Sequence, residues 1–122
     1  METKYKVGLK GQQAAEDWLI NKGYTIITRN YRVRTGELDL IVDNSECIAF
    51  VEVKYRRGLK FGLPREAVGV TKQKRMATAA LQYVADNDLS DTNLRFDVIE
   101  VIENGGIMEV VHIENAFELS GF

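Results

Sequence analysis

Apolar and polar residues alternate in two stretches of the first half of the chain. Residues 36–42 read Gly-Glu-Leu-Asp-Leu-Ile-Val, and residues 50–54 read Phe-Val-Glu-Val-Lys. A period of two is typical of β-strands, whose side chains point alternately to the two faces of a sheet. The residues between the stretches include the turn-forming run 43–46. The pattern therefore predicts a β-hairpin with an even-length loop.

Residues 4–22 show the period of an amphipathic helix instead. The expected apolar stripe consists of Val7, Ala15, Trp18 and Leu19. Gly8 and Gly11 would allow a neighbouring element to approach that side closely, and Gly23 is a suitable C-cap.

A second helix is predicted to begin near Pro64 or Thr71, with Thr71 as its N-cap, and to end near residue 86. Its apolar face consists of Met76, Ala79, Ala80, Tyr83 and Val84. Further strands are expected at 24–34, 94–102 and 107–113, with a glycine-containing loop at 56–65 and a hairpin turn at 104–106. The order αβββαββ predicts an α/β fold with a mixed central sheet flanked by helices.

Composition limits the class of protein. With 122 residues, 45% of them hydrophobic, the chain can form one domain, residues 1–122, around one core. No apolar run could span a bilayer and no signal-peptide pattern is present, so we expect a cytoplasmic protein without membrane partners. Cys47 and His112 are the only residues of their types, which excludes an internal disulfide and argues against structural zinc. We expect Cys47 to be a small apolar residue and His112 a polar strand residue.

Four charged residues fall on one face of the predicted hairpin. Glu37 and Asp39 share a face of the first strand, and Glu52 and Lys54 share a face of the second. With the expected loop, Asp39 lies opposite Phe50 and Glu37 opposite Glu52. Neighbouring carboxylates repel one another unless a cation lies among them. The cluster therefore predicts a site for a hard metal with oxygen ligands, Mg²⁺ or Mn²⁺, beside a lysine.

An ordinary solvated strand face is the other interpretation of this cluster. Ile41 and Phe50 lie among the charges, however, so the face is only partly polar. Because an unpartnered carboxylate is costly to bury, this interleaving favours the metal interpretation.

Positive charge gathers in the part of the chain that holds the cluster. Residues 1–75 contain 15 Lys and Arg against 9 Asp and Glu, whereas residues 76–122 contain one against 9. The net charge of −2 therefore conceals a basic part and an acidic part. A basic face beside a carboxylate site predicts a nucleic acid as the partner.

The motifs together resemble the YraN family, a bacterial group of the PD-(D/E)XK nuclease superfamily that is similar to archaeal Holliday junction resolvases. Asp39 followed by Glu52-x-Lys54 is similar to the superfamily's metal motif, with Leu38 at the position usually held by proline. The resemblance covers roughly residues 8–101. Its other segments are Gly8-x-x-Gly11 with Ala15-Glu16, Gly23-Tyr24, Arg29-Asn30-Tyr31-Arg32, Gly36-Glu37, Lys72-x-x-Arg75 and Arg95-Phe96-Asp97-Val98.

The resemblance implies a restriction-endonuclease-like domain that hydrolyses phosphodiester bonds with Mg²⁺ or Mn²⁺. Asp39, Glu52 and the carbonyl of Val53 are the expected metal ligands, and Glu37 is a further one. Lys54 is expected to stabilise negative charge developing on the phosphate.

Roles outside the hairpin follow from the same likeness. Glu16 matches the glutamate of the resolvases' first helix and is expected to act on the metal, directly or through water. Lys72 falls in the first turn of the second helix, on the side facing the sheet, where anions are favoured. The expected phosphate-binding residues are Arg32, Arg56, Arg57, Lys72 and Arg75. The likeness also implies a homodimer and DNA, ahead of RNA, as substrate.

Two other functions fit the same residues. One is a nucleic-acid-binding module of nuclease-like fold without turnover. The other is a non-enzymatic interaction protein in which the cluster forms strand salt bridges. Titration with a divalent ion distinguishes these functions, because a salt-bridge network requires no metal whereas a metal site binds the ion.

Overall fold

The computed structural model describes residues 4–57 and 68–118, with side chains from residue 8 onward. Its elements are α1 (Lys4–Asn21), β1 (Thr25–Val33), β2 (Gly36–Asp43), β3 (Ile48–Arg57), α2 (Val70–Asp86), β4 (Leu94–Asn104) and β5 (Ile107–Phe117). The predicted order αβββαββ is confirmed, in a single small α/β domain. No helix among the described residues is long and apolar enough to cross a membrane.

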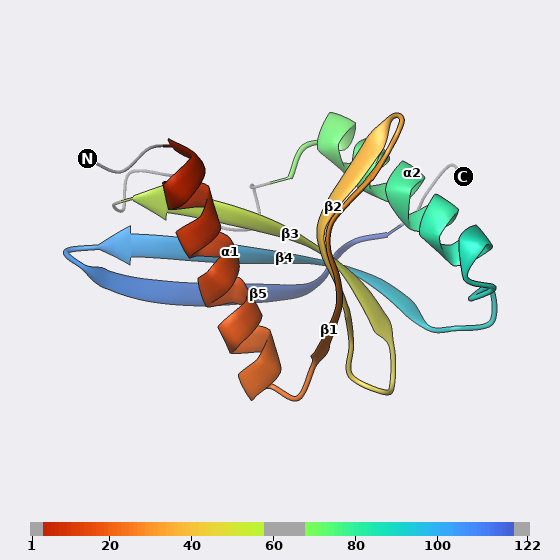
Figure 1. Ribbon diagram of the computed structural model, residues 1–122, viewed down its shortest axis with the longest axis horizontal. Helices are drawn as coiled ribbons and strands as arrows, with labels where there is room; N and C mark the ends of the chain where they lie inside the picture. Colours follow the sequence, from red (N-terminus) through yellow and green to blue (C-terminus); the bar gives the residue numbers. More distant parts are fainter. Residues whose placement is uncertain (1–3, 58–67, 119–122) are drawn as a thin grey trace.

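The strands form one mixed sheet in the order β1-β2-β3-β4-β5 (Figure 1). The β3–β4 pair is parallel and the other pairs are antiparallel. Parallel neighbours need a crossover connection, and α2 lies on the connection between them. The sheet therefore has β3 at its centre and β1 and β5 at its edges.

The two helices cover opposite faces of the sheet. α1 buries Ala15 and Leu19 against Val51, whereas α2 buries Met76 against Phe50, and these two neighbours on β3 point to opposite faces. The predicted helical stripes are thus largely confirmed, although Trp18 is 37% exposed at the edge of its stripe.

Within the described part of the chain, Gly11 is the glycine of α1 that permits close packing. A Cβ at Gly11 would lie 2.9 Å from the Cβ of Tyr55, so this glycine lets α1 approach β3. No described atom lies within 4 Å of a Cβ at Gly8, so the prediction for Gly8 stays a prediction.

The hairpin register differs from the predicted one by two residues. Ile41, rather than Asp39, lies opposite Phe50. The turn falls at residues 44–47, because the Asn44 side chain accepts hydrogen bonds from the backbone N–H groups of Glu46 and Cys47 and closes the loop one residue later. A shift of two residues by itself keeps both strands on their predicted faces. The alternation of β2 nevertheless breaks at Asp39, because Leu38 packs on the α2 side with Phe50 whereas Leu40 packs on the α1 side.

Two further element boundaries differ from the predicted ones. Gly69 is the N-cap of α2, with no side-chain cap, and Thr71 lies within the first turn. β3 continues to Arg57, so Arg56 and Arg57 belong to a strand rather than to the predicted loop. The rest of that loop lies outside the described residues.

Both edge strands are irregular. The β1–β2 register shifts between Ile26 and Thr28, and Asn30 has a positive φ of 52°. The β4–β5 register shifts between Phe96 and Val98, and Asn115 on β5 has a φ of 51°. The predicted turn between β4 and β5 is confirmed as a two-residue turn of glycines at 105 and 106, both with positive φ.

Candidate metal and phosphate site

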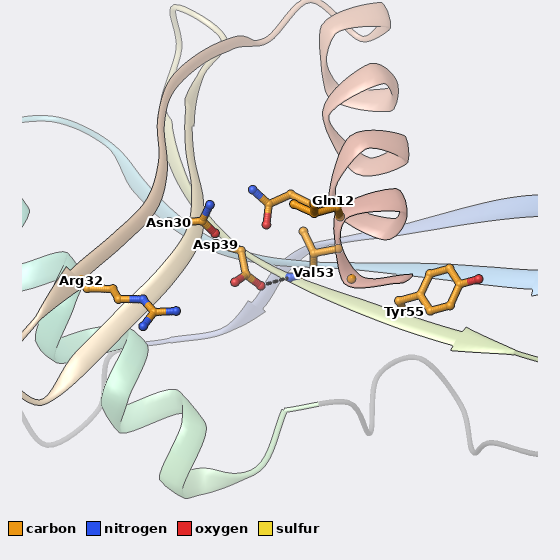
Figure 2. Close-up of a pocket in the computed structure, with 8 residues that line it drawn as sticks. Gln12, Asn30, Arg32, Asp39, Val53 and Tyr55 are labelled. Atoms are coloured by element: carbon orange, nitrogen blue, oxygen red, sulfur yellow. Dashed lines mark hydrogen bonds between the residues drawn. The ribbon is translucent and has the colours of Figure 1, made fainter. Parts of the chain in front are cut away.

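The site begins where β2 separates from β3. Leu40↔Val51 is the last pair of the β2–β3 ladder, and beyond it β2 follows β1 alone. Asp39 is the first residue past this fork. Its Oδ2 accepts a hydrogen bond of 2.7 Å from the backbone N–H of Val53 (Figure 2). The carboxylate therefore accepts the hydrogen bond of a β3 amide that the backbone of the diverging strand β2 no longer reaches.

Glu52 lies beside Asp39 and is almost completely buried, with 5% of its surface exposed. Burial, together with the charge and hydrogen bonding of the Asp39 carboxylate, raises the pKa of Glu52 to about 7. The structure thus brings Asp39 and Glu52 together, but in a register that differs from the predicted one.

Glu37 is surrounded by cations instead of carboxylates. Its Oε1 lies 3.0 Å from Lys72 Nζ and 3.5 Å from Arg75 Nη2, and its Oε2 lies 4.0 Å from Arg32 Nε. The hydrogen bond and charge of Lys72 hold the pKa of Glu37 below its usual value. Among the described residues, no group of three or more His, Cys, Asp or Glu side chains could hold a metal. The carboxylates brought together here are therefore a pair, and Glu37's metal role stays a prediction.

Lys72 connects the two parts of the site. Its Nζ lies 3.2 Å from Glu52 Oε2 as well as 3.0 Å from Glu37 Oε1. Burial opposes its charge, but the Glu52 and Glu37 carboxylates outweigh this effect and raise the pKa of Lys72. Its ammonium is therefore firmly protonated.

Lys54 lies on β3 two residues beyond Glu52, level with Glu100 on β4. Glu100 is buried and forms an ion pair with Arg56. Burial raises the pKa of Glu100, and the charges of Arg56 and Lys54 partly offset that rise. Arg57 lies 3.5 Å from a carboxylate oxygen of Glu103. Both arginines therefore have carboxylate partners within the protein. Their predicted contacts with phosphate stay predictions.

A cavity of about 540 Å³ opens on the α1 side of the fork. Its lining residues are Gly8, Leu9, Gln12, Asn30, Arg32, Asp39, Val53 and Tyr55. In Figure 2 the Gln12 side chain extends from α1 toward Asn30 and Asp39. Asp39 thus belongs both to the cavity and to the carboxylate pair.

Gln12 and Asn30 line the cavity but were not predicted as site residues. Asn30 lies between the pairs Arg29↔Leu40 and Tyr31↔Leu38, level with Asp39, and its left-handed backbone twists β1 at the fork. An asparagine in a strand hints at such a conformation, because Asn tolerates positive φ. Gln12 carries no comparable signal.

Glu16 is not among the cavity-lining residues. It lies one turn after Gln12 on α1, is 6% exposed, and accepts a 2.8 Å hydrogen bond from Arg29 Nε. Its expected action on the metal stays a prediction.

A second buried polar cluster lies away from the fork and contains His112. Asp97 is completely buried and accepts hydrogen bonds from Arg95, from the backbone of Asn115 and from His112 Nε2 at 2.8 Å. Trp18 Nε1 lies 3.3 Å from His112 Nδ1, which assigns the proton to Nε2. Burial alone would raise the pKa of Asp97, but these partners lower it. The cluster ties α1 to β4 and β5.

Comparison with known proteins gives one consistent result. The model of the uncharacterised protein family UPF0102 matches residues 11–101. A UPF0102 protein of Trichlorobacter lovleyi is 46% identical over 93% of this chain and 91% of its own length. Relatives of the same name from Clostridium acetobutylicum, 45% identical over 93% and 95%, and Syntrophotalea carbinolica, 40% identical over 98% and 97%, are similar throughout. None of these names states an activity.

Proposed function

The chain belongs to the uncharacterised protein family UPF0102, and we propose that it is a metal-dependent endonuclease acting on nucleic acid in the cytoplasm, DNA ahead of RNA. The observation that carries this proposal is the buried Asp39–Glu52 pair at the fork. Two carboxyl groups are held together here, and burial and their mutual repulsion raise the pKa of Glu52 to about 7 although Lys72 lies beside it. Perturbed groups of this kind beside a cavity are typical of functional sites.

The residues at the fork fit a divalent ion. Glu52 Oε2 is buried and makes no hydrogen bond, although the Lys72 ammonium lies 3.2 Å away. Asp39, Glu52 and the Val53 carbonyl would hold Mg²⁺ or Mn²⁺ through oxygen, the ligand type that both ions prefer. When bound, the ion supplies Lewis-acid stabilisation of the phosphate and a more acidic water.

The remaining chemistry falls to side chains around the pair. Lys54, next along β3 on the Glu52 face, stabilises the negative charge that develops on the phosphate. Arg32, Lys72 and Arg75 bind flanking phosphates, because they bring three cations to one carboxylate and leave net positive charge there. Branched DNA is the substrate suggested by the likeness to junction resolvases.

A non-catalytic nucleic-acid-binding module is the second candidate. The contacts of Lys72 with Glu37 and Glu52 favour it, since they partly neutralise the carboxylates without a metal. Turnover with a divalent ion separates the two functions.

The test is a cleavage screen with Mn²⁺ against single-stranded, duplex and branched DNA and structured RNA. We expect cleavage of at least one DNA substrate and a loss of about a hundredfold or more in Asp39→Asn, because a metal ligand is gone. Asp43→Asn is the matched control: it lies on the same strand, and its Oδ1 accepts a hydrogen bond from Ser45 N that an amide oxygen can also accept.

Lys54→Ala separates chemistry from binding in the same screen. This variant should lose cleavage while Mn²⁺ still raises its melting temperature, since an ion bound only by the folded state stabilises it. Equal cleavage by wild type and Asp39→Asn, or no effect of Mn²⁺ on wild-type melting, would contradict the proposed function.

A further inference from the structure

Lys72 contacts two carboxylates at the same time. Its ammonium lies 3.0 Å from Glu37 and 3.2 Å from Glu52, which belong to different strands. The two partners differ in environment: the Glu37 side chain is 31% exposed, whereas that of Glu52 is 7% exposed. Lys72 therefore links a carboxylate at the mouth of the site, Glu37, to one in its interior, Glu52.

Resting on the proposed function, we propose that Lys72 is a built-in counter-cation of Glu52 that a divalent ion displaces, so that metal and nucleic acid bind with positive coupling. After displacement from Glu52, the Lys72 ammonium remains paired with Glu37, where it binds a phosphate of the nucleic acid.

Displacement follows from the position of the ammonium. Among the described residues, Lys72 is the cation that forms an ion pair with Glu52, and it does so at Oε2, the buried oxygen without a hydrogen bond that a metal would use. A divalent ion on this oxygen and an ammonium within hydrogen-bonding distance of it would repel each other strongly in a poorly solvated site. The ammonium can move without losing all its partners, because Glu37 continues to hold it.

Coupling follows from the charges left at Glu37. Once released from Glu52, Lys72 joins Arg75 and Arg32 around this single carboxylate, so the group carries uncompensated positive charge. Lys72 also lies in the first turn of α2, whose N-cap Gly69 offers no side-chain acceptor. Backbone N–H groups at such an end favour an anion. A phosphate would therefore hold Lys72 in the position that frees Glu52 for the metal.

Thermodynamic linkage makes the coupling measurable from either side. If the metal raises the affinity for nucleic acid, nucleic acid raises the affinity for the metal by the same factor. The effect is a property of binding and does not depend on turnover.

The experiment compares the full-length wild type with Lys72→Met, titrated with Mn²⁺ alone by calorimetry. Methionine keeps most of the side-chain length but removes the competing charge. We expect Lys72→Met to bind Mn²⁺ about tenfold more tightly, because the charge that competes with the ion for Glu52 is gone. Lys74→Met is the matched control, because Lys74 is exposed on the same helix. It should bind Mn²⁺ as the wild type does.

A second titration adds a phosphorothioate DNA duplex, which keeps the backbone charge and resists cleavage. The duplex should raise the Mn²⁺ affinity of the wild type and of Lys74→Met severalfold, but that of Lys72→Met much less. Equal or weaker Mn²⁺ binding by Lys72→Met in the first titration, or an equal effect of the duplex on all three proteins, overturns the inference. Binding and cleavage by the wild type report separately on the proposed function, so a failure of coupling alone leaves that function standing.

Discussion

At Glu52, burial and a neighbouring carboxylate both act against the charged form. In the metal-free folded protein Glu52 keeps its proton up to about pH 7, whereas its ordinary pKa is 4.5. Between these values the folded state binds more protons than the unfolded state, so the free energy of unfolding falls as the pH rises. The shift corresponds to a total loss of about 3 kcal/mol.

Urea unfolding with a chelator, at pH values from about 5 to 8, measures this slope. Glu52→Gln should flatten it and be the more stable protein at the alkaline end, because a neutral amide causes no repulsion. Glu46→Gln, exposed in the hairpin loop, serves as control and should keep the wild-type slope. A wild-type stability that rises steadily across this range would show that Glu52 is ionised in the folded protein.

Single residues of the site differ in how far the sequence reveals them. The alternation of charges and apolar groups predicted that Asp39 and Glu52 share a face, although it put Asp39 opposite Phe50, and helical phase predicted that Lys72 faces the sheet. The three cations around Glu37 could not be predicted, since they come from two separate elements whose approach depends on packing. The position of Gln12 in the cavity could not be predicted either, because it depends on how α1 packs on the sheet.

Among the elements, α2 is positioned against the sheet by one glycine. A Cβ at Gly36 would lie 2.3 Å from the backbone O of Arg75 and 2.9 Å from the backbone N of Ala79. Neither backbone atom can move without moving the helix. Gly36 therefore sets the distance between β2, which carries Glu37, and the helix that carries Lys72.

Gly36→Ala should destabilise the protein by about 2 to 4 kcal/mol, because overpacking against backbone costs more than against a flexible side chain. Chemical denaturation measures the change. Gly8→Ala is the control in a helix interior with open space, and it should stabilise the protein by up to about 1 kcal/mol. Similar effects of the two substitutions would mean that α2 is not seated on Gly36.

Element types were predictable because period-two and helical patterns are strong in this chain. Turn positions were less so. The hairpin closed one residue later than expected because the Asn44 side chain satisfies two loop amides. Thr71 is a suitable N-cap by residue type, yet the helix begins at Val70 after Gly69. The sharp twist at Asn30 is a tertiary feature that the alternation does not contain.

On the scale of the whole molecule, the basic groups around Glu37 predict how DNA binding responds to salt. Each phosphate contact released contributes about 0.9 to the slope of log affinity against log salt. The double variant Arg32→Ala/Arg75→Ala should therefore lower the magnitude of this slope by about 2. Fluorescence anisotropy with labelled duplex DNA at several salt concentrations provides the measurement.

Lys22→Ala is the control for charge alone. Lys22 follows the C-terminal end of α1, next to Glu114 and the His112 cluster, about 15 Å along the helix axis from Gln12. It should keep the wild-type slope. If all three proteins gave the same slope, the phosphate track would lie elsewhere on the surface.

The irregular edges of the sheet also limit how other protein chains can associate with the molecule. An open edge strand is a template onto which another chain can add and start aggregation. Here β1 and β5 each carry a break in register and an asparagine with positive φ, and both present charged side chains. Such strands cannot offer a long, straight row of free amides and carbonyls. We therefore expect this small protein to resist edge-to-edge polymerisation when crowded, and any self-association to use a helical face.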